Sequence, residues 1–380
     1  MYMKVAMFTD SYFPRINGVS ISVNSFAEEL ALFGHKILII CSDYDNDKPL
    51  IEINPKSFIE KTSNANINIF RVSSIPVIIS KEDKVARLSQ WNKIKRQLDE
   101  YAPDVIHING EFSIGLSGLV YGKYRKIPIV FTFHTLWEEY VGKYLKMLPD
   151  HVARKLGKEL VKLYLKRADE VIAPTLRIAE VVREYGITTH MDVLPTGITK
   201  SVYVVDQEEV QTVKREIYKK YPIFRDKKIL LYVGRIVKEK NVEFLIDMFE
   251  KLQLTSPNTV LVLVGDGPDF EYIKERVSNS EYKDKIFLLG YKDRTKIPMY
   301  YQLADIFVFP SVTETQGLVT VEAMMSGLPV VAIGRMGTVD VMNGDNGGFM
   351  VEPDINIFKE KVELLLNDKE LYKAKCNEAL

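Results

Sequence analysis

Cysteine is scarce in this sequence, and its scarcity excludes the classes of protein held together by disulfides or by cysteine-bound metals. The chain of 380 residues contains only two cysteines, Cys41 and Cys376, which lie near opposite ends. Two such distant residues form neither a disulfide framework nor a metal cluster, and sparing use of cysteine is typical of the reducing cytoplasm. We therefore expect a cytoplasmic protein that is stabilised by its hydrophobic cores.

Net charge and long apolar runs are also missing. The 51 basic residues are balanced by 51 acidic ones, so the formal net charge is zero and offers no general attraction to nucleic acid. No apolar run is long enough to span a bilayer, and the first residues, Met-Tyr-Met-Lys, lead directly into a predicted strand without a signal-peptide pattern. With 46% hydrophobic residues, a chain of this length exceeds what one core serves, so we expect two domains.

A complete dinucleotide fingerprint is absent too. Gly265 and Gly267 follow a predicted strand and precede a predicted helix, but Phe270 stands where the third glycine of the fingerprint belongs. The next strand is followed by Tyr291 and not by an acid that would bind a ribose hydroxyl. These departures argue against a nicotinamide dehydrogenase, although such an enzyme would share the alternating strand and helix pattern of this chain.

The clearest positive signal is the segment 306–333, which predicts a strand, a turn, a helix and a second strand. We expect strands at Ile306–Phe309 and Val330–Ile333, with a helix at Leu318–Met325, where apolar side chains recur at helical spacing. Pro310 ends the first strand, and a Gly-Leu-Pro sequence ends the helix. The turn then lies at a helix N-terminus on the carboxyl side of a parallel sheet, where free backbone N–H groups and the helix dipole favour anions.

Two carboxylates, Glu314 and Glu322, belong to this segment, with seven residues between them. By itself such a pair is typical of an exposed helix face. In the setting ETQGLVTVEAMMSGLPVVA, however, the pair resembles the donor-site signature of the family 4 retaining glycosyltransferases. The resemblance covers nearly the whole chain and implies an α/β protein of GT-B fold, in which two doubly wound, Rossmann-like domains face each other across a cleft.

The resemblance also implies a role for the residues around the turn. The donor would be a nucleoside diphosphate sugar, with Glu314 binding the sugar hydroxyls and Glu322 the ribose hydroxyls. Gly317 and Leu318 would contribute backbone contacts, and Tyr291 would lie beside the nucleotide base. In the resembled mechanism the leaving phosphate takes the proton of the acceptor hydroxyl, so no side chain needs to act as a general base.

Arg235 and Lys240 follow the predicted strand 229–233 and suit a diphosphate leaving group. Arginine offers a planar fork of donors and lysine a point charge, both placed where negative charge grows as the glycosidic bond breaks. The resembled family uses the matching residues in this way and works without a metal or another cofactor. The acidic loop 43–47, DYDND, invites a metal interpretation, but we interpret it as a solvated loop after a strand.

Two candidates lie in the N-terminal half, Gly18 and His134. In the resembled family a loop like Asn17-Gly18-Val19 lets the backbone approach the donor diphosphate, which a residue without a Cβ permits. The family also places a histidine beside the transferred sugar, and His134 follows a predicted strand that ends at the carboxyl edge of the sheet. The alternatives are an ordinary turn glycine and a structural histidine. The residues expected to take part in catalysis are thus His134, Arg235, Lys240 and Glu314.

A basic amphipathic segment spans residues 143–167. Leucines and valines recur there at helical spacing, and only two acids oppose the positive charge. The basic residues are Lys143, Lys146, Arg154, Lys155, Lys158, Lys162, Lys166 and Arg167. Such a helix can lie on an anionic membrane, or it can be an ordinary helix with its apolar side on the core and its lysines in water.

A narrower resemblance favours the membrane. The run HTLWEEYVGKYL from His134 to Leu145, followed by basic residues and RADEVIAPT, is similar to bacterial diacylglycerol glucosyltransferases. This implies transfer of glucose from uridine diphosphate glucose, with retention, to the hydroxyl of a membrane lipid such as diacylglycerol, by an enzyme docked on the inner face of the cell membrane. Two alternatives remain: a transferase with a polysaccharide or other glycan acceptor, and a non-catalytic protein that binds sugar nucleotides.

The domains are predicted from breaks in the pattern. We expect an acceptor-binding domain at 1–195, a linker at 196–206 around a Pro-Thr-Gly sequence, and a donor-binding domain at 207–380. Helices are expected at 25–32 and 85–98, with a loop at 10–24. After a helix at 357–366 we expect a charged stretch to Leu380. The resembled fold usually carries a further C-terminal helix that crosses back to the first domain, and we expect no room for a full helix of that kind.

Overall fold

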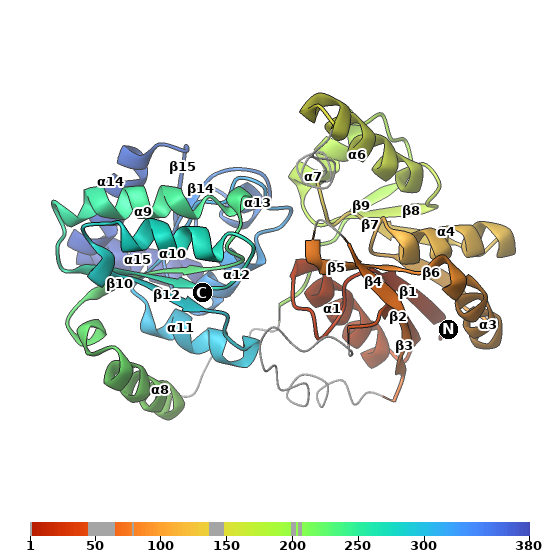
Figure 1. Ribbon diagram of the computed structural model, residues 1–380, viewed down its shortest axis with the longest axis horizontal. Helices are drawn as coiled ribbons and strands as arrows, with labels where there is room; N and C mark the ends of the chain where they lie inside the picture. The colour runs from red at the N-terminus through yellow and green to blue at the C-terminus, as the bar shows by residue number, and fades with distance from the viewer. Residues whose placement is uncertain (1, 45–64, 78–79, 137–147, 199–202, 204–206) are drawn as a thin grey trace. The chain divides into compact units, whose positions relative to one another are not determined.

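The computed structural model describes residues 2–44, 65–77, 80–136, 148–198, 203 and 207–380, which are drawn as ribbon in Figure 1. The chain divides into two compact units, Met1–Gly197 and Ile198–Leu380. The predicted linker lies across this division, and its residues 199–202 and 204–206 fall outside the described part. Among the described helices, none combines the length and the apolar character needed to cross a membrane.

The first unit is built on a sheet of seven parallel strands in the order β3-β2-β1-β6-β7-β8-β9. The strands are β1 (Lys4–Thr9), β2 (Lys36–Ser42), β3 (Ile67–Val72), β6 (Val105–Ile108), β7 (Ile129–Thr132), β8 (Glu170–Ala173) and β9 (Met191–Val193). The helices are α1 (Gly18–Leu32), α3 (Trp91–Tyr101), α4 (Ser113–Arg125), α6 (Asp150–Leu165) and α7 (Leu176–Glu184). A separate antiparallel hairpin pairs β4 (Ser74–Val77) with β5 (Ser80–Ala86).

The second unit repeats this plan with six parallel strands in the order β12-β11-β10-β13-β14-β15. The strands are β10 (Lys228–Val233), β11 (Thr259–Val264), β12 (Ile286–Gly290), β13 (Ile306–Phe309), β14 (Val330–Ile333) and β15 (Gly348–Val351). The helices are α8 (Gln207–Lys220), α9 (Val242–Gln253), α10 (Phe270–Ser278), α11 (Ile297–Leu303), α12 (Leu318–Met325), α13 (Gly337–Val341), α14 (Ile355–Asn367) and α15 (Lys369–Ala379). Helices α9, α10 and α14 lie on one side of the sheet, and α8 and α11 lie on the other (Figure 1).

The strands are apolar over nearly their whole length because helices cover both faces of each sheet. All six residues of β11, TVLVLV, are buried, and so are five of the six residues of β1. A parallel sheet also brings the carboxyl ends of its strands to one edge. In the second unit β13 lies beside β10, and in the first unit β6 lies between β1 and β7, so the loops that follow these strands are neighbours.

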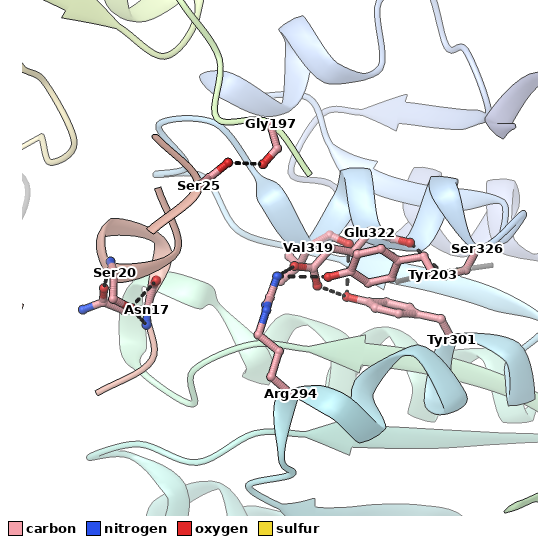
Figure 2. Close-up of polar contacts among 10 residues, drawn as sticks. All are labelled: Asn17, Ser20, Ser25, Gly197, Tyr203, Arg294, Tyr301, Val319, Glu322 and Ser326. Carbon is pink, nitrogen blue, oxygen red and sulfur yellow. Dashed lines mark hydrogen bonds and ion pairs between the residues drawn. The ribbon is translucent and has the colours of Figure 1, made fainter. Parts of the chain in front are cut away.

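Helix α1 begins earlier than the sequence analysis predicted, because a capping box starts it within the expected loop 10–24. The side chain of Asn17 accepts a hydrogen bond from the backbone N–H of Ser20 at 2.9 Å, and the Ser20 hydroxyl accepts one from the backbone N–H of Asn17 at 2.9 Å (Figure 2). These reciprocal bonds satisfy two donors at the helix start. The helix therefore runs from Gly18, and the predicted start at Ser25 is wrong.

The predicted helix 85–98 is also wrong at its start. Val85 belongs to β5 and pairs with Ile75, and the backbone N–H of Ala86 donates to the Ser113 hydroxyl at 2.7 Å. Helix α3 begins only at Trp91. Tertiary pairing of the hairpin outweighs the local helical pattern here.

The charged stretch after α14 forms a further helix, α15, which the sequence analysis missed. Asp368 ends α14 and caps α15, because its carboxylate accepts from the backbone N–H groups of Glu370 and Leu371 at 3.1 and 2.9 Å. The helix packs within the second unit, where the Cα of Ala379 lies 3.0 Å from the position a Cβ would take on Gly347.

Candidate active site

The turn between β13 and α12 depends on a glycine. Gly317 is the N-cap residue of α12 and has a φ of +74°, a left-handed conformation that residues with a Cβ adopt only with strain. The preceding loop is held by a second glycine, since the backbone N–H of Gly337 donates to the Glu314 carbonyl at 2.8 Å. A Cβ on Gly337 would lie only 2.4 Å from the Thr315 carbonyl oxygen. The two glycines thus fix the backbone on either side of Glu314, with Leu318 as the first residue of the helix.

Glu314 and Lys240 form an ion pair, Nζ to Oε1. Lys240 ends a short 3-10 helix, Lys238–Lys240, that follows β10, and Glu314 follows the neighbouring strand β13. Their side chains are only 16% and 14% exposed, so the pair is largely shielded from water. Two of the predicted donor-site residues, 74 positions apart in sequence, are therefore in direct contact.

Arg235 lies in the same loop after β10 and is half-buried. Its carbonyl accepts a hydrogen bond from the hydroxyl of Tyr232 at 2.8 Å, a side chain that is fully buried in the core. This bond ties the start of the loop to the strand that precedes it. The loop therefore brings both predicted phosphate-binding cations, Arg235 and Lys240, to the carboxyl edge of the sheet.

Glu322 is buried, with 1% of its surface exposed, and both of its carboxylate oxygens are engaged (Figure 2). Oε1 accepts from Nη2 of Arg294 at 2.6 Å, and Oε2 accepts from the Tyr301 hydroxyl at 3.1 Å. Nη2 of Arg294 also donates to the Tyr203 hydroxyl at 2.9 Å. Although burial alone would lower it, the pKa of Arg294 is raised by the negative charge of Glu322, so the guanidinium stays charged.

This network was not predicted from the sequence. Arg294 follows the turn after β12 and belongs to no motif, and Tyr203 and Tyr301 come from other parts of the second unit. Only the strand order, which puts β12 and β13 on either side of β11 and β10, makes the contact possible. The proposed contact between Glu322 and ribose hydroxyls stays a prediction, and it would have to be made by a carboxylate that already has two protein partners.

Tyr291 lies directly after β12, at a turn where Gly290 has a φ of +67°. Burial, with a smaller effect from Asp293, raises the pKa of the Tyr291 hydroxyl to about 12. Within the described part of the chain, this buried hydroxyl makes no hydrogen bond. The side chain of Lys292 folds back onto the same turn and donates to the carbonyls of Leu289 and, at 3.2 Å, Tyr291.

In the first unit, Gly18 is the first residue of α1. A Cβ at this position would have no heavy atom of the described chain within 4 Å, so the backbone is accessible there. The sequence analysis placed Gly18 in a loop, whereas the structure places it at a helix N-terminus, where free N–H groups and the helix dipole also favour an anion.

His134 lies two residues after β7, and its Nε2 is 3.0 Å from Oδ1 of Asn109, which follows the neighbouring strand β6. Burial, together with the nearby His107, lowers the pKa of His134 to about 3, so the imidazole is neutral at physiological pH. His107 is buried on β6 and bonds Oγ1 of Thr132 at 2.7 Å through Nε2. Asn109 was not singled out as a site residue, and its only sequence signal is its place at the end of a strand.

Helix α6 carries four of the eight predicted membrane-docking residues, Arg154, Lys155, Lys158 and Lys162. Lys166 and Arg167 follow it directly, and Lys143 and Lys146 lie outside the described residues. The face of α6 that packs on the core is formed by Ala153, Val161, Tyr164 and Leu165, not by the predicted leucine stripe. Of the apolar residues that recur in this segment, Val152, Leu160 and Leu163 are half-buried, whereas Leu148 is 39% and Leu156 is 50% exposed. The predicted apolar side is therefore only partly covered.

The basic residues of α6 and of the two positions after it divide into two groups. Arg154, Lys155, Lys166 and Arg167 are exposed. Lys158 and Lys162 are half-buried, because Lys158 Nζ lies 4.3 Å from the ring centre of Tyr185 and Lys162 Nζ lies 3.0 Å from Glu159. The exposed basic residues thus accompany two exposed leucines, Leu156 on the helix and Leu148 just before it.

A possible metal-ligand group among the described residues lies elsewhere in the first unit. Glu170, His190 and Asp192 come together on β8 and beside β9, where Nδ1 of His190 is 2.8 Å from a Glu170 oxygen. The hydrogen bond to Glu170, with its negative charge, raises the pKa of His190. This group is separate from the residues discussed above and includes none of the predicted site residues.

Comparisons with known sequences identify the family. The family model described as Glycosyltransferase Family 4 matches residues 16–201, and the one described as Glycosyl transferases group 1 matches residues 213–379. The alpha-monoglucosyldiacylglycerol synthase of Streptococcus pneumoniae is 31% identical over 333 residues, which cover 88% of this chain and 71% of the relative. The chain belongs to glycosyltransferase family 4.

Other relatives of this family 4 enzyme differ in the activity their names state. An alpha-monoglucosyldiacylglycerol synthase of Acholeplasma laidlawii is 31% identical over 338 residues, covering 87% of this chain and 80% of the relative. A GDP-mannose-dependent alpha-mannosyltransferase of Corynebacterium glutamicum is 26% identical over 377 residues, covering 96% and 81%. The family 4 enzyme is thus a glycosyltransferase, and its relatives span more than one donor sugar.

Solved structures show the fold of the family 4 enzyme. The HepE protein of Anabaena, solved with UDP and glucose, superposes with a TM-score of 0.76 at 17% identity, covering 100% of this chain and 94% of that one. A sucrose-phosphate synthase of Thermosynechococcus elongatus also superposes with a TM-score of 0.76, at 21% identity, covering 99% and 93%. The fold is GT-B with two Rossmann-like domains, and the family and fold predicted from the segment around Glu314 and Glu322 are confirmed.

Proposed function

We propose that this enzyme transfers glucose from uridine diphosphate glucose to the hydroxyl of a membrane lipid such as diacylglycerol, with retention of configuration. The single observation that carries the proposal is the pair of relatives at 31% identity, both named alpha-monoglucosyldiacylglycerol synthase. The term alpha supports retention, because the glucose of the donor is itself α-linked to phosphate. The solvent face of α6 supports a membrane acceptor.

Four residues would act on the donor. Arg235 and Lys240 would bind the diphosphate and stabilise the negative charge that develops as the glycosidic bond breaks. Glu314 would bind hydroxyls of the glucose, and Glu322, oriented by Arg294, would reach the ribose. Since Lys240 is paired with Glu314, the donor phosphate would exchange one anionic partner of the ammonium for another and leave Glu314 free to accept hydrogen bonds from the sugar.

Two groups of the first unit would act beside the reacting atoms. The N-terminus of α1 at Gly18 would approach the diphosphate, and His134 would contact a sugar or acceptor hydroxyl as a neutral imidazole. The proton of the acceptor hydroxyl would pass to the leaving phosphate as the new glycosidic bond forms on the face from which the phosphate departs. No metal and no other cofactor takes part in this proposal.

Helix α6 would bring the enzyme to its acceptor. Leu156 on the helix and Leu148 just before it are exposed apolar side chains. Exposed positive charge comes from Arg154 and Lys155 on the helix and from Lys166 and Arg167 directly after it. Apolar insertion and attraction to anionic headgroups are the two contributions that hold an interfacial helix on a membrane. The proposed location is therefore the inner face of the cell membrane, with peripheral attachment.

The test is transfer of radiolabelled glucose from uridine diphosphate glucose to diacylglycerol in vesicles, with and without anionic lipid. Labelled glycolipid that increases with anionic lipid is expected. A variant with Arg154, Lys155, Lys166 and Arg167 changed to glutamine should lose vesicle binding by several-fold per charge, since each is worth about 1 kcal/mol near the surface. A matched control changes Lys93, Lys123, Lys126 and Arg177, which lie on other elements of the same unit.

The control variant should bind vesicles like the wild type. Release of free glucose without glycolipid would support the donor and reject the lipid acceptor, and a glycan acceptor would then be tested. Equal vesicle binding by the α6 variant and the wild type would reject docking through this helix. Transfer from GDP-mannose in preference to uridine diphosphate glucose would reject the proposed donor.

A further inference from the structure

A buried amide holds the only hydrogen bond that His134 makes to the described part of the chain. Asn109 is 2% exposed, and its Oδ1 lies 3.0 Å from Nε2 of His134. The other end of the amide, Nδ2, donates to the His107 carbonyl at 3.4 Å, and the backbone N–H of Asn109 donates to the Phe8 carbonyl at 2.8 Å. These bonds to β6 and β1 orient the amide so that its oxygen faces the imidazole.

The direction of this bond fixes the tautomer of His134. A carbonyl oxygen only accepts hydrogen bonds, so the proton of the neutral imidazole must sit on Nε2. Burial keeps the ring neutral, since the pKa of His134 is lowered to about 3. The other ring nitrogen, Nδ1, therefore carries a lone pair, and it makes no hydrogen bond to any described residue.

The loop that carries Asn109 is itself held firmly. Oδ1 of Asp10, at the end of β1, accepts from the backbone N–H of Ile114 at 3.1 Å and from the Ser113 hydroxyl at 3.4 Å, both at the start of α4. From the other side, the hydroxyl of Tyr164 on α6 donates to the Glu111 carbonyl at 3.0 Å. Because both ends of the loop are anchored, the amide of Asn109 cannot turn away from the histidine without breaking several buried bonds.

We propose that Asn109 is a positioning residue that holds His134 as the Nε2–H tautomer and thereby presents Nδ1 as a hydrogen-bond acceptor to one hydroxyl of the bound substrates. The proposal rests on the proposed function, because it takes His134 to lie beside the reacting sugar. Two substrates carry hydroxyls of this chemistry, the transferred hexose and the lipid acceptor. A neutral acceptor nitrogen suits either, since it attracts a hydroxyl proton without bringing charge close to the leaving diphosphate.

The tautomer can be measured without any substrate. In full-length protein labelled with ¹⁵N-histidine, two-dimensional spectra of ring nitrogens and carbons distinguish Nε2–H from Nδ1–H, and His134→Gln assigns the signal. The wild type should show Nε2–H from pH 5 to 8. An Nδ1–H form in the wild type would overturn the proposal.

Three variants separate positioning from simple packing. Asn109→Leu should mix the two tautomers and lower kcat for transfer by at least about tenfold, because His134 loses its partner. Asn109→Asp should keep Nε2–H and restore most of the activity at high pH. Its carboxylate should raise the pKa of His134, so activity should fall as the pH drops and Nδ1 gains a proton. Asn24→Leu, which removes another buried asparagine of the same unit, should leave the tautomer unchanged.

Three results would contradict the role proposed for Asn109. If Asn109→Leu keeps both the Nε2–H form and normal kcat, Asn109 does not position His134. If Asn109→Asp is as inactive as Asn109→Leu at every pH, the effect of Asn109 is structural and the proposal fails. A loss of activity in Asn24→Leu as large as that in Asn109→Leu would likewise point to packing alone.

Adding substrates then shows which hydroxyl binds. A change in the Nδ1 shift with uridine diphosphate glucose, but not with uridine diphosphate, assigns the bond to the hexose. A change only after diacylglycerol is added in mixed micelles assigns it to the acceptor. No change with either would overturn the proposal. Failure of the proposed function would remove the transfer reaction, but the Nε2–H tautomer of the wild type and the protonation of His134 in Asn109→Asp would still be seen in the spectra.

Discussion

The candidate site residues of the two units differ in charge. In the second unit the predicted donor-site carboxylates are each paired with a cation, Glu314 with Lys240 and Glu322 with Arg294, in positions largely shielded from water. In the first unit the histidine near the sheet edge is neutral and is held by an amide. A nucleoside diphosphate brings two negative charges, whereas an acceptor hydroxyl brings none. Each unit therefore has the electrostatics of the substrate proposed for it.

Removing Arg294, the partner of the most buried carboxylate, should have the largest effect on protein stability. Arg294→Met would leave Glu322, 1% exposed, as a buried unpaired charge, and should destabilise the second unit by about 3–5 kcal/mol. Both tryptophans, Trp91 and Trp137, belong to the first unit, so their fluorescence follows that unit alone during urea unfolding, while circular dichroism follows both.

The expected result is a circular dichroism transition that moves to lower urea while the tryptophan transition stays in place. Arg294→Met combined with Glu322→Gln should lose less stability, because no lone charge is then buried. If Arg294→Met is as stable as the wild type in urea unfolding, the ion pair does not stabilise the second unit. The two units would then differ less in their dependence on ion pairs.

Lys240→Ala and Glu314→Ala test whether the second, less buried pair serves the reaction. Each should lower kcat by about 100- to 1,000-fold, the usual cost of removing one preorganised electrostatic group, with a much smaller loss of stability. Lys238→Ala is the matched control, since Lys238 lies on the same 3-10 helix but is exposed. The control should turn over normally. Near-normal transfer by Lys240→Ala would remove Lys240 from the active site.

Asp10 offers a test in the first unit, because its buried carboxyl is hydrogen-bonded by the backbone and a hydroxyl at the start of α4 and not by a cation of the described residues. Burial raises its pKa from 3.8 to about 6 despite hydrogen bonds from the start of α4. A raised pKa means that the folded state binds the proton more tightly than the unfolded state does. Stability of the first unit should therefore be highest at low pH and decrease as the pH rises from about 4 to about 6.

Asp10→Asn should abolish this pH dependence and stabilise the first unit at pH 7 by up to about 3 kcal/mol. Tryptophan fluorescence during urea unfolding at pH 4, 5, 6 and 7 measures it. If Asp10→Asn instead destabilises the unit at pH 7, the carboxylate contributes more as a partner of the α4 backbone than its burial costs, and the first unit would resemble the second in relying on fixed charge.

Local patterns in the sequence predict much of the fold. Strands β13 and β14 and helix α12 have the predicted bounds. Their apolar patterns are strongly periodic, and Pro310 ends the first strand while the Gly-Leu-Pro sequence after Ser326 ends the helix. Helix α1 was predicted too short although its signal is local, since Asn17 and Ser20 have the side chains of a capping box. Helix α15 was missed because its cap, Asp368, also ends the helix before it.

Contacts between distant residues account for what the sequence could not predict. Lys240 meets Glu314 only because β10 and β13 are neighbours, and strand order is not encoded in any short motif. The same is true of Asn109 beside His134, and of Arg294 beside Glu322. The residue types of the candidate site could be predicted from a family signature, but the hydrogen-bond and ion-pair partners of those residues come from tertiary structure.

The ion pair between Lys240 and Glu314 also has a consequence for product inhibition if the donor binds as proposed. After the nucleoside diphosphate departs, the carboxylate of Glu314 would lie within reach of the ammonium that had bound the phosphate. Glu314 would then compete with the product nucleotide for the same cation, which would favour release of the product and weaken its rebinding. The side chain proposed to bind the sugar would thus also restore the free enzyme between turnovers.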